Sequence, residues 1–126
     1  IWVSNHGGRS LDSGISTLLI LPEIRAAIKH KTIIVDGGIR TGGDIIKCLA
    51  MGADFIALGR PLVYGLAVDG DRGVKRIIEL FKEELIFSMA MCGINEISDI
   101  NYKNICKIPS LEDSFSILKN NSTGID

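Results

Sequence analysis

An α/β fold with a parallel sheet is predicted for this chain of 126 residues. Three short apolar runs, residues 1–3, 33–35 and 55–58, are separated by segments whose apolar residues recur with helical spacing. The runs do not alternate apolar with polar residues, which is typical of strands covered on both faces. Each run leads into a turn of glycine or polar residues. This repeated order of strand and helix predicts right-handed crossovers, with the functional residues at the carboxyl ends of the strands.

The first two helices are indicated by apolar spacing and by residues that favour helix ends. Pro22 fits a first helical position, and the apolar spacing over residues 24–28 continues that helix. A second helix is expected to start near Asp44 and to close at Gly52, which suits a left-handed backbone. Its inner stripe consists of Ile45, Ile46, Leu49 and Ala50.

The C-terminal third is expected to be helical up to residue 91. A short helix follows Pro61 and runs through Leu66, and a longer one covers residues 73–91, with Gly93 after its end. From Asn101 onward the sequence turns polar. We therefore expect one domain over residues 1–100 and a loosely ordered tail over residues 101–126.

Composition and charge exclude several classes of function. Fourteen basic and 15 acidic residues give a formal net charge of -1, which supports neither a nucleic-acid interface nor a polybasic membrane patch. No apolar run approaches the roughly 18 residues of a membrane span, and no signal peptide is visible, so a cytoplasmic location is expected. The three cysteines lack C-x-x-C spacing and are interpreted as reduced thiols without a metal or disulfide.

Two consecutive strand ends carry glycine and arginine. The first is the segment Asp36-Gly37-Gly38-Ile39-Arg40, and the second is Gly59-Arg60. Glycines let the backbone approach a phosphate, an arginine adds a charge-assisted contact, and Asp36 can accept a hydrogen bond from a sugar hydroxyl. TIM barrels often build a phosphate site after strands seven and eight. The alternative interpretation is a pair of tight turns with surface arginines.

The first strand end has a different composition, Ser4-Asn5-His6-Gly7-Gly8-Arg9. A histidine can take and hold a proton near neutral pH, and a nearby arginine can bind a carboxylate in a bidentate manner. A base beside a carboxylate clamp suits a 2-hydroxy acid as substrate. From these residues alone, a structural histidine is an equally good interpretation.

These segments together resemble the FMN-dependent 2-hydroxy-acid oxidase and dehydrogenase family, over roughly residues 1–100. The stretch Ser4 to Asp12 is the specific part of the resemblance, whereas Asp36 to Arg40 followed by Gly59-Arg60-Pro61 also occurs in other phosphate-binding TIM barrels. The resemblance implies FMN as cofactor and His6 as the active-site base, with Arg9 holding the substrate carboxylate. It implies that the flavin is bound by Ser4, Asp36, Gly37, Gly38, Ile39, Arg40, Gly59 and Arg60.

The resemblance also implies where the chain lies in the complete fold. It corresponds to about strands six to eight, the C-terminal part of a TIM (β/α)8 barrel. We therefore expect a fragment or truncated product that is inactive alone. In a full-length context it would oxidise an L-2-hydroxy acid to the 2-oxo acid, pass electrons to oxygen or another acceptor, and form a homo-oligomer.

Two other functions are open at this point. The first is another phosphate-binding barrel enzyme, similar to isopentenyl-diphosphate isomerase or IMP dehydrogenase. Those enzymes lack the histidine loop, so that loop separates them from the leading interpretation. The second is a non-catalytic partial barrel.

Overall fold

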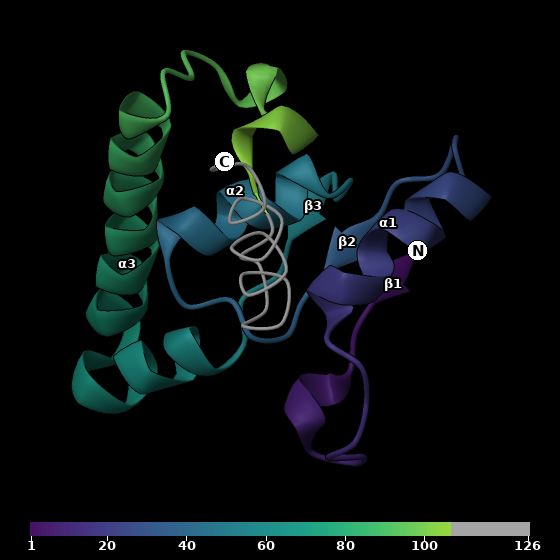
Figure 1. Cartoon of the computed structure of the whole chain (residues 1–126). Coiled ribbons are helices and arrows are strands. Elements are labelled where there is room, and N and C mark those ends of the chain that lie inside the picture. Colours follow the sequence, from purple (N-terminus) through teal and green to yellow (C-terminus); the bar gives the residue numbers. More distant parts are fainter. Residues whose placement is uncertain (107–126) are drawn as a thin grey trace, which may run out of the picture.

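The computed structural model describes residues 1–106 and contains three parallel strands with helices beside them (Figure 1). The strands are β1 (Trp2–Val3), β2 (Ile34–Val35) and β3 (Phe55–Ile56), in the sheet order β1-β2-β3. In the register of the sheet, Trp2 lies beside Ile34, and Ile34 lies beside Phe55. The predicted α/β fold with a parallel sheet is confirmed.

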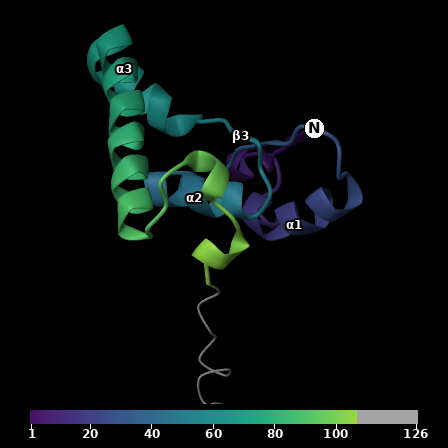
Figure 2. The ribbon, with the colours of Figure 1, turned by 90° about the horizontal axis from the view of Figure 1, so that it is seen from above.

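The helices are α1 (Thr17–Ala27), α2 (Gly42–Ala50) and α3 (Arg60–Met91), with short 3-10 helices η1 (His6–Gly8), η2 (Ile97–Asp99) and η3 (Tyr102–Asn104). Helices α1 and α2 lie on one face of the sheet (Figure 2). This follows from the topology, because each crossover steps to the next strand in the same direction. Of the predicted tail, residues 101–106 include η3, and the remainder lies outside the described residues.

The main core lies between the sheet and these two helices. Val3 and Val35 pack there with Leu21 of α1 and Cys48 of α2, and all four are buried. The opposite face differs, because Trp2 is 60% exposed and Phe55 is 61% exposed. The expectation that both faces are covered is therefore wrong for residues 1–106. Only the alternate side chains that point toward the helices are enclosed.

The position of Pro22 corrects a sequence prediction. Pro22 lies inside α1 and not at its first position, because the helix begins five residues earlier at Thr17. Leu21, which is fully buried, needs that earlier start to reach the core. Burial of a leucine side chain contributes about 2 kcal/mol, which offsets much of the roughly 3 kcal/mol that a proline costs inside a helix.

The start and end of α2 agree with the sequence prediction. Asp44 occupies the third position of the helix and forms a capping box with Thr41, in which each side chain accepts from the other residue's N–H. Gly52, with a φ of +109°, follows the helix in the left-handed region. Of the four residues predicted for the inner stripe, Ile46 is buried and the other three are half-buried.

Helix α3 consists of two legs, in agreement with the two helices predicted for this segment. Asp69 and Gly70 have non-helical backbone angles and separate the legs. The legs meet at Gly65 and Gly73, where a Cβ atom on Gly73 would lie 1.9 Å from the Gly65 carbonyl oxygen. After α3, Gly93 has a φ of +67° and lets Ile94 turn back onto Ile46 and Met89.

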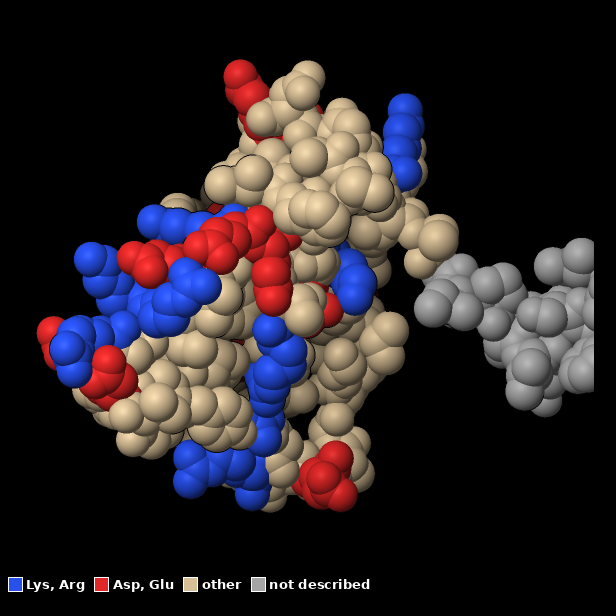
Figure 3. Space-filling view, turned by 90° about the vertical axis from the view of Figure 1, so that its left-hand side faces the viewer, with Lys and Arg blue, Asp and Glu red and all other residues tan. Residues whose placement is uncertain are grey.

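The surface formed by α3 carries charges of both signs. Figure 3 views that side of the molecule, where basic and acidic side chains lie next to one another. Arg76 pairs with Glu83 at 2.9 Å, and Arg72 pairs with Asp69 at 2.8 Å. None of the helices in residues 1–106 has an apolar stretch long enough to cross a membrane.

The contact between α2 and α3 gives a test of this packing. A Cβ atom on Gly42 would lie 2.2 Å from the Leu85 backbone nitrogen, whereas one on Gly43 would meet only side-chain oxygens at 3.7 and 4.0 Å. Gly42→Ala is expected to lower the free energy of unfolding by about 1–3 kcal/mol through overpacking. Gly43→Ala should leave it unchanged or raise it by up to about 1 kcal/mol. Urea denaturation followed by circular dichroism measures both, and equal effects would contradict the contact.

Candidate active site

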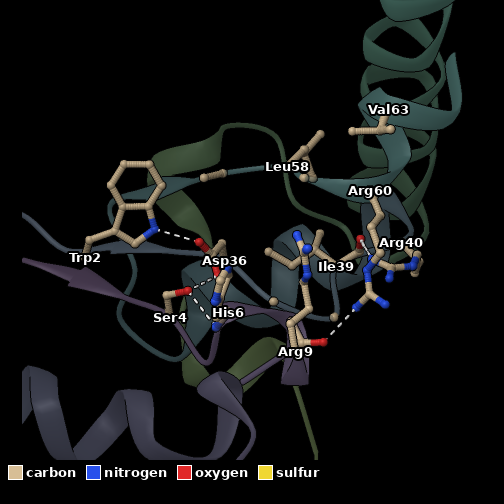
Figure 4. A pocket seen from close by; sticks show the side chains of 15 residues that line it. Trp2, Ser4, His6, Arg9, Asp36, Ile39, Arg40, Leu58, Arg60 and Val63 are labelled. Carbon is tan, nitrogen blue, oxygen red and sulfur yellow. Dashed lines mark hydrogen bonds between the residues drawn. The ribbon is translucent and has the colours of Figure 1, made fainter. Parts of the chain in front are cut away.

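The carboxyl ends of the three strands line one pocket of about 380 Å³ (Figure 4). Parallel strands all end at the same edge of a sheet, which is why loops distant in sequence meet there. Every residue that the sequence singled out for the site lines this pocket: Ser4, His6, Arg9, Asp36, Gly37, Gly38, Ile39, Arg40, Gly59 and Arg60. The lining residues that the sequence reasoning missed are Trp2, Gly7, Ala57, Leu58 and Val63.

His6 lies in a loop with an unusual backbone. Its φ is +54°, a left-handed conformation that is uncommon for a residue other than glycine, and Gly7 and Gly8 are also left-handed. Hydrogen bonds from neighbouring residues hold this turn. The Asn5 side chain accepts from the Gly7 N–H at 3.0 Å, and the Ser4 hydroxyl accepts from the His6 N–H at 3.0 Å. Such strain is typical of functional sites, where the surrounding structure maintains it.

The His6 ring is exposed and is oriented by one side chain. Its Nδ1 atom forms a hydrogen bond of 3.1 Å with the Ser10 hydroxyl. Within residues 1–106, Nε2 has no hydrogen-bond partner and is therefore the ring nitrogen that is open to a ligand.

The Asp36 carboxylate, just after β2, is held by two donors from β1 and the residue that follows it. Its Oδ1 accepts from the Ser4 hydroxyl at 2.6 Å, and its Oδ2 accepts from the Trp2 indole N–H at 2.8 Å. An ionised carboxylate has about four acceptor sites, so each oxygen keeps one for a ligand hydroxyl. Ser4 itself lies between His6 and Asp36.

Buried Thr17 anchors the backbone at this point. Its hydroxyl donates to the Asp36 carbonyl oxygen at 2.7 Å, and only 4% of the residue is exposed. The same turn leaves no room for a side chain on Gly37, because a Cβ atom there would lie 2.6 Å from the Asn5 side-chain oxygen. Thr17 therefore fixes the loop that carries Asp36 and Gly37.

The arginines form the cationic end of the pocket. Arg40 and Arg60 come from neighbouring strand ends and lie on the side opposite Trp2 and Asp36 (Figure 4). Arg60 donates to the Gly7 carbonyl oxygen at 3.3 Å, which links the third strand end to the His6 loop. The Arg9 guanidinium also lines the pocket and makes no ion pair within residues 1–106.

The N-termini of α2 and α3 differ in whether their backbone N–H groups are open to a ligand. At the start of α2, the Gly42 N–H donates to the Glu84 carboxylate of α3 at 2.8 Å, so this group is not open to a ligand. At the start of α3, Gly59 and Arg60 line the pocket, and their N–H groups have no hydrogen-bond partner within the described part of the chain. An anion in the pocket would therefore meet α3 and not α2.

No cysteine is among the residues that line this pocket. Burial is the main reason that the pKa of the Cys48 thiol rises to about 11, and Cys92 and Cys106 are exposed. In residues 1–106, no group of three His, Cys, Asp or Glu side chains gathers closely enough to hold a metal ion.

The family model described as FMN-dependent dehydrogenase matches residues 1–107. The chain belongs to this family. FMN is the family's cofactor, and the family's enzymes are oxidoreductases.

Individual members of the FMN-dependent dehydrogenase family resemble the chain closely over part of their length. An L-lactate oxidase from a Nostoc species is 51% identical over 102 residues, which are 80% of this chain and 28% of that protein. A peroxisomal (S)-2-hydroxyacid oxidase of Arabidopsis thaliana is 42% identical over 83% of this chain and 29% of its own length. The solved structure of a Pediococcus acidilactici lactate oxidase, described as putative, superimposes with a TM-score of 0.77 at 44% identity, over 81% of this chain and 29% of that one. The chain thus spans less than a third of the length of these relatives.

The hydrogen bond from Thr17 gives a test of the site's construction. Thr17→Val keeps the shape of the side chain but leaves the Asp36 carbonyl without its donor, so the free energy of unfolding should fall by about 1–3 kcal/mol. Thr17→Ser keeps the hydroxyl and should retain most of that stability. Chemical denaturation compares the two variants, and a valine variant as stable as the serine variant would contradict this assignment.

Proposed function

We propose that this chain forms strands six to eight of an eight-stranded barrel in an FMN-dependent 2-hydroxy-acid oxidase or dehydrogenase. One observation carries the proposal. A histidine and an arginine from the first strand end share a pocket with the glycine and arginine residues of the next two strand ends. The groups that we assign as base, carboxylate clamp and phosphate site would thereby face one pocket.

The cationic end of the pocket suits the phosphate of FMN. Arg40 and Arg60 would each supply a charge-assisted hydrogen bond, and the open N–H groups at Gly59 and Arg60 would supplement them. The pocket volume of about 380 Å³ lies in the usual range for small-molecule sites, about 300–1,000 Å³. The residues present therefore fit this cofactor.

The opposite end suits the rest of the cofactor. Asp36 would accept hydrogen bonds from ribityl hydroxyls through the acceptor sites that Ser4 and Trp2 leave unused. Ile39 and Leu58 line the pocket between the two ends and would pack against the carbon chain of the ribityl group. When bound, FMN accepts the two electrons that leave the substrate and passes them to oxygen or another acceptor.

His6 and Arg9 would act on the substrate. Arg9 carries a planar guanidinium that can bind a carboxylate through two parallel hydrogen bonds. His6 would take a proton at Nε2. This requires that the neutral ring carries its own proton on Nδ1, where the N–H donates a hydrogen bond to the Ser10 hydroxyl. The proton would come from the substrate's hydroxyl or from its α-carbon.

The alternatives are less well supported. An enzyme similar to IMP dehydrogenase or isopentenyl-diphosphate isomerase would not need the His6–Arg9 loop, and the family match covers that loop. The exposed Trp2 and Phe55 support the prediction that the chain alone does not enclose a flavin and is inactive. A homo-oligomer and a cytoplasmic location stay predictions, and one relative is named as peroxisomal.

The test is to place this chain in the L-lactate oxidase of the Nostoc species, in exchange for the 102-residue segment that it matches. In this chimera, His6→Asn should slow anaerobic flavin reduction by L-lactate by about 100- to 10,000-fold, the usual contribution of a base. Asparagine tolerates the left-handed backbone, so the variant removes the base without adding strain. Stopped-flow absorbance measures the rate.

The matched control is His30→Asn, which changes the chain's other histidine, an exposed residue outside the pocket. It should reduce its flavin at the rate of the unaltered chimera. Flavin reduction within tenfold of that rate in His6→Asn would remove His6 from the role of base.

A further inference from the structure

We propose that Trp2 and Ser4 are positioning residues that together clamp the Asp36 carboxylate, and that the clamp extends through Ser4 to the backbone of His6. The part of this proposal that concerns flavin rests on the proposed function. The clamp itself rests on contacts among the described residues.

The clamp follows from the twofold period of the strands. Trp2 in β1 and Ser4 just after it are two residues apart, so their side chains point to the same side of the sheet. Asp36 lies two residues after Ile34, the β2 residue that pairs with Trp2, and its side chain points to that side too. The indole N–H and the serine hydroxyl therefore reach the same side chain. Each donates to a different oxygen of the carboxylate, at 2.8 and 2.6 Å, and two such donors fix both its position and its rotation.

The second link joins the clamp to His6. The Ser4 hydroxyl has one proton, which it donates to Asp36, so its oxygen is oriented to accept from the His6 N–H at 3.0 Å. His6 needs such support because its φ of +54° is unfavourable for its residue type. A displaced carboxylate would turn the Ser4 hydroxyl away and remove this support.

A role in packing alone does not account for Trp2. The residue is 60% exposed, and its polar N–H is bonded to a residue of the neighbouring strand. Its ring lines one end of the pocket (Figure 4). Trp2 therefore forms a wall of the site while it fixes the group that we assign to the ribityl hydroxyls.

The experiment uses the indole N–H as a direct probe, because Trp2 is the one tryptophan of the 126-residue chain. In ¹⁵N-labelled protein without flavin, Asp36→Asn should speed solvent exchange of this N–H by about tenfold, the factor expected for a hydrogen bond to a charged group. The backbone amide signal of His6 should move in Trp2→Phe and in Ser4→Ala. Phe55→Leu, which alters an equally exposed aromatic residue of the same sheet, should change neither signal.

Two results would overturn the clamp: an indole exchange rate that Asp36→Asn leaves unchanged, or a His6 signal that is the same in Trp2→Phe and the parent chain. If the Trp2→Phe variant unfolds, as shown by loss of dispersion in its NMR spectrum, the Ser4→Ala and Asp36→Asn variants test the clamp in its place. A titration with FMN then separates the two proposals. Because the chain alone is not expected to enclose a flavin, FMN is added to the lactate oxidase chimera. A clamp that is intact in the chain, together with a chimera that binds no FMN, supports the clamp and contradicts the proposed function.

Discussion

The parallel pairing of the three strands is the constraint on which the site depends. The Asp36 N–H donates to the Val3 carbonyl at 3.1 Å, and the Ala57 N–H donates to the Val35 carbonyl at 2.9 Å. These bonds align the strand ends, so that their loops open onto one pocket. A slip of one residue would exchange the faces of each strand and would bury Trp2 while it exposed Val3.

Side-chain hydrogen bonds then shape the loops that the sheet brings together. Asn5 and Ser4 hold the left-handed turn at His6, Thr17 holds the carbonyl of Asp36, and Arg60 reaches back to Gly7. The result is a pocket with a cationic end and a carboxylate end. That separation of charge suits a ligand whose phosphate is followed by a chain of hydroxyl groups.

Much of this arrangement could be predicted from the sequence, because the signals are local. Apolar runs that lead into glycine-rich turns indicate parallel strands and place the ten site residues at one edge. Other features depend on contacts between distant residues. Proline is typical of the first position of a helix, so Pro22 predicts a start there. The helix begins at Thr17 instead, and Leu21 in its first turns is buried in the core. Trp2 has the character of a core strand residue, and its bond to Asp36 depends on the register of two strands. The blocked N-terminus of α2 depends on Glu84, 42 positions later in the chain.

The central claim is that the pocket holds FMN with its phosphate at the end formed by Arg40 and Arg60. The most direct measurement compares the affinities of FMN and riboflavin for the lactate oxidase chimera, by quenching of flavin fluorescence. Riboflavin has the same ring and ribityl chain but lacks the phosphate. Two charge-assisted contacts predict that FMN binds at least about 100-fold more tightly. Equal affinity for the two flavins would contradict the account.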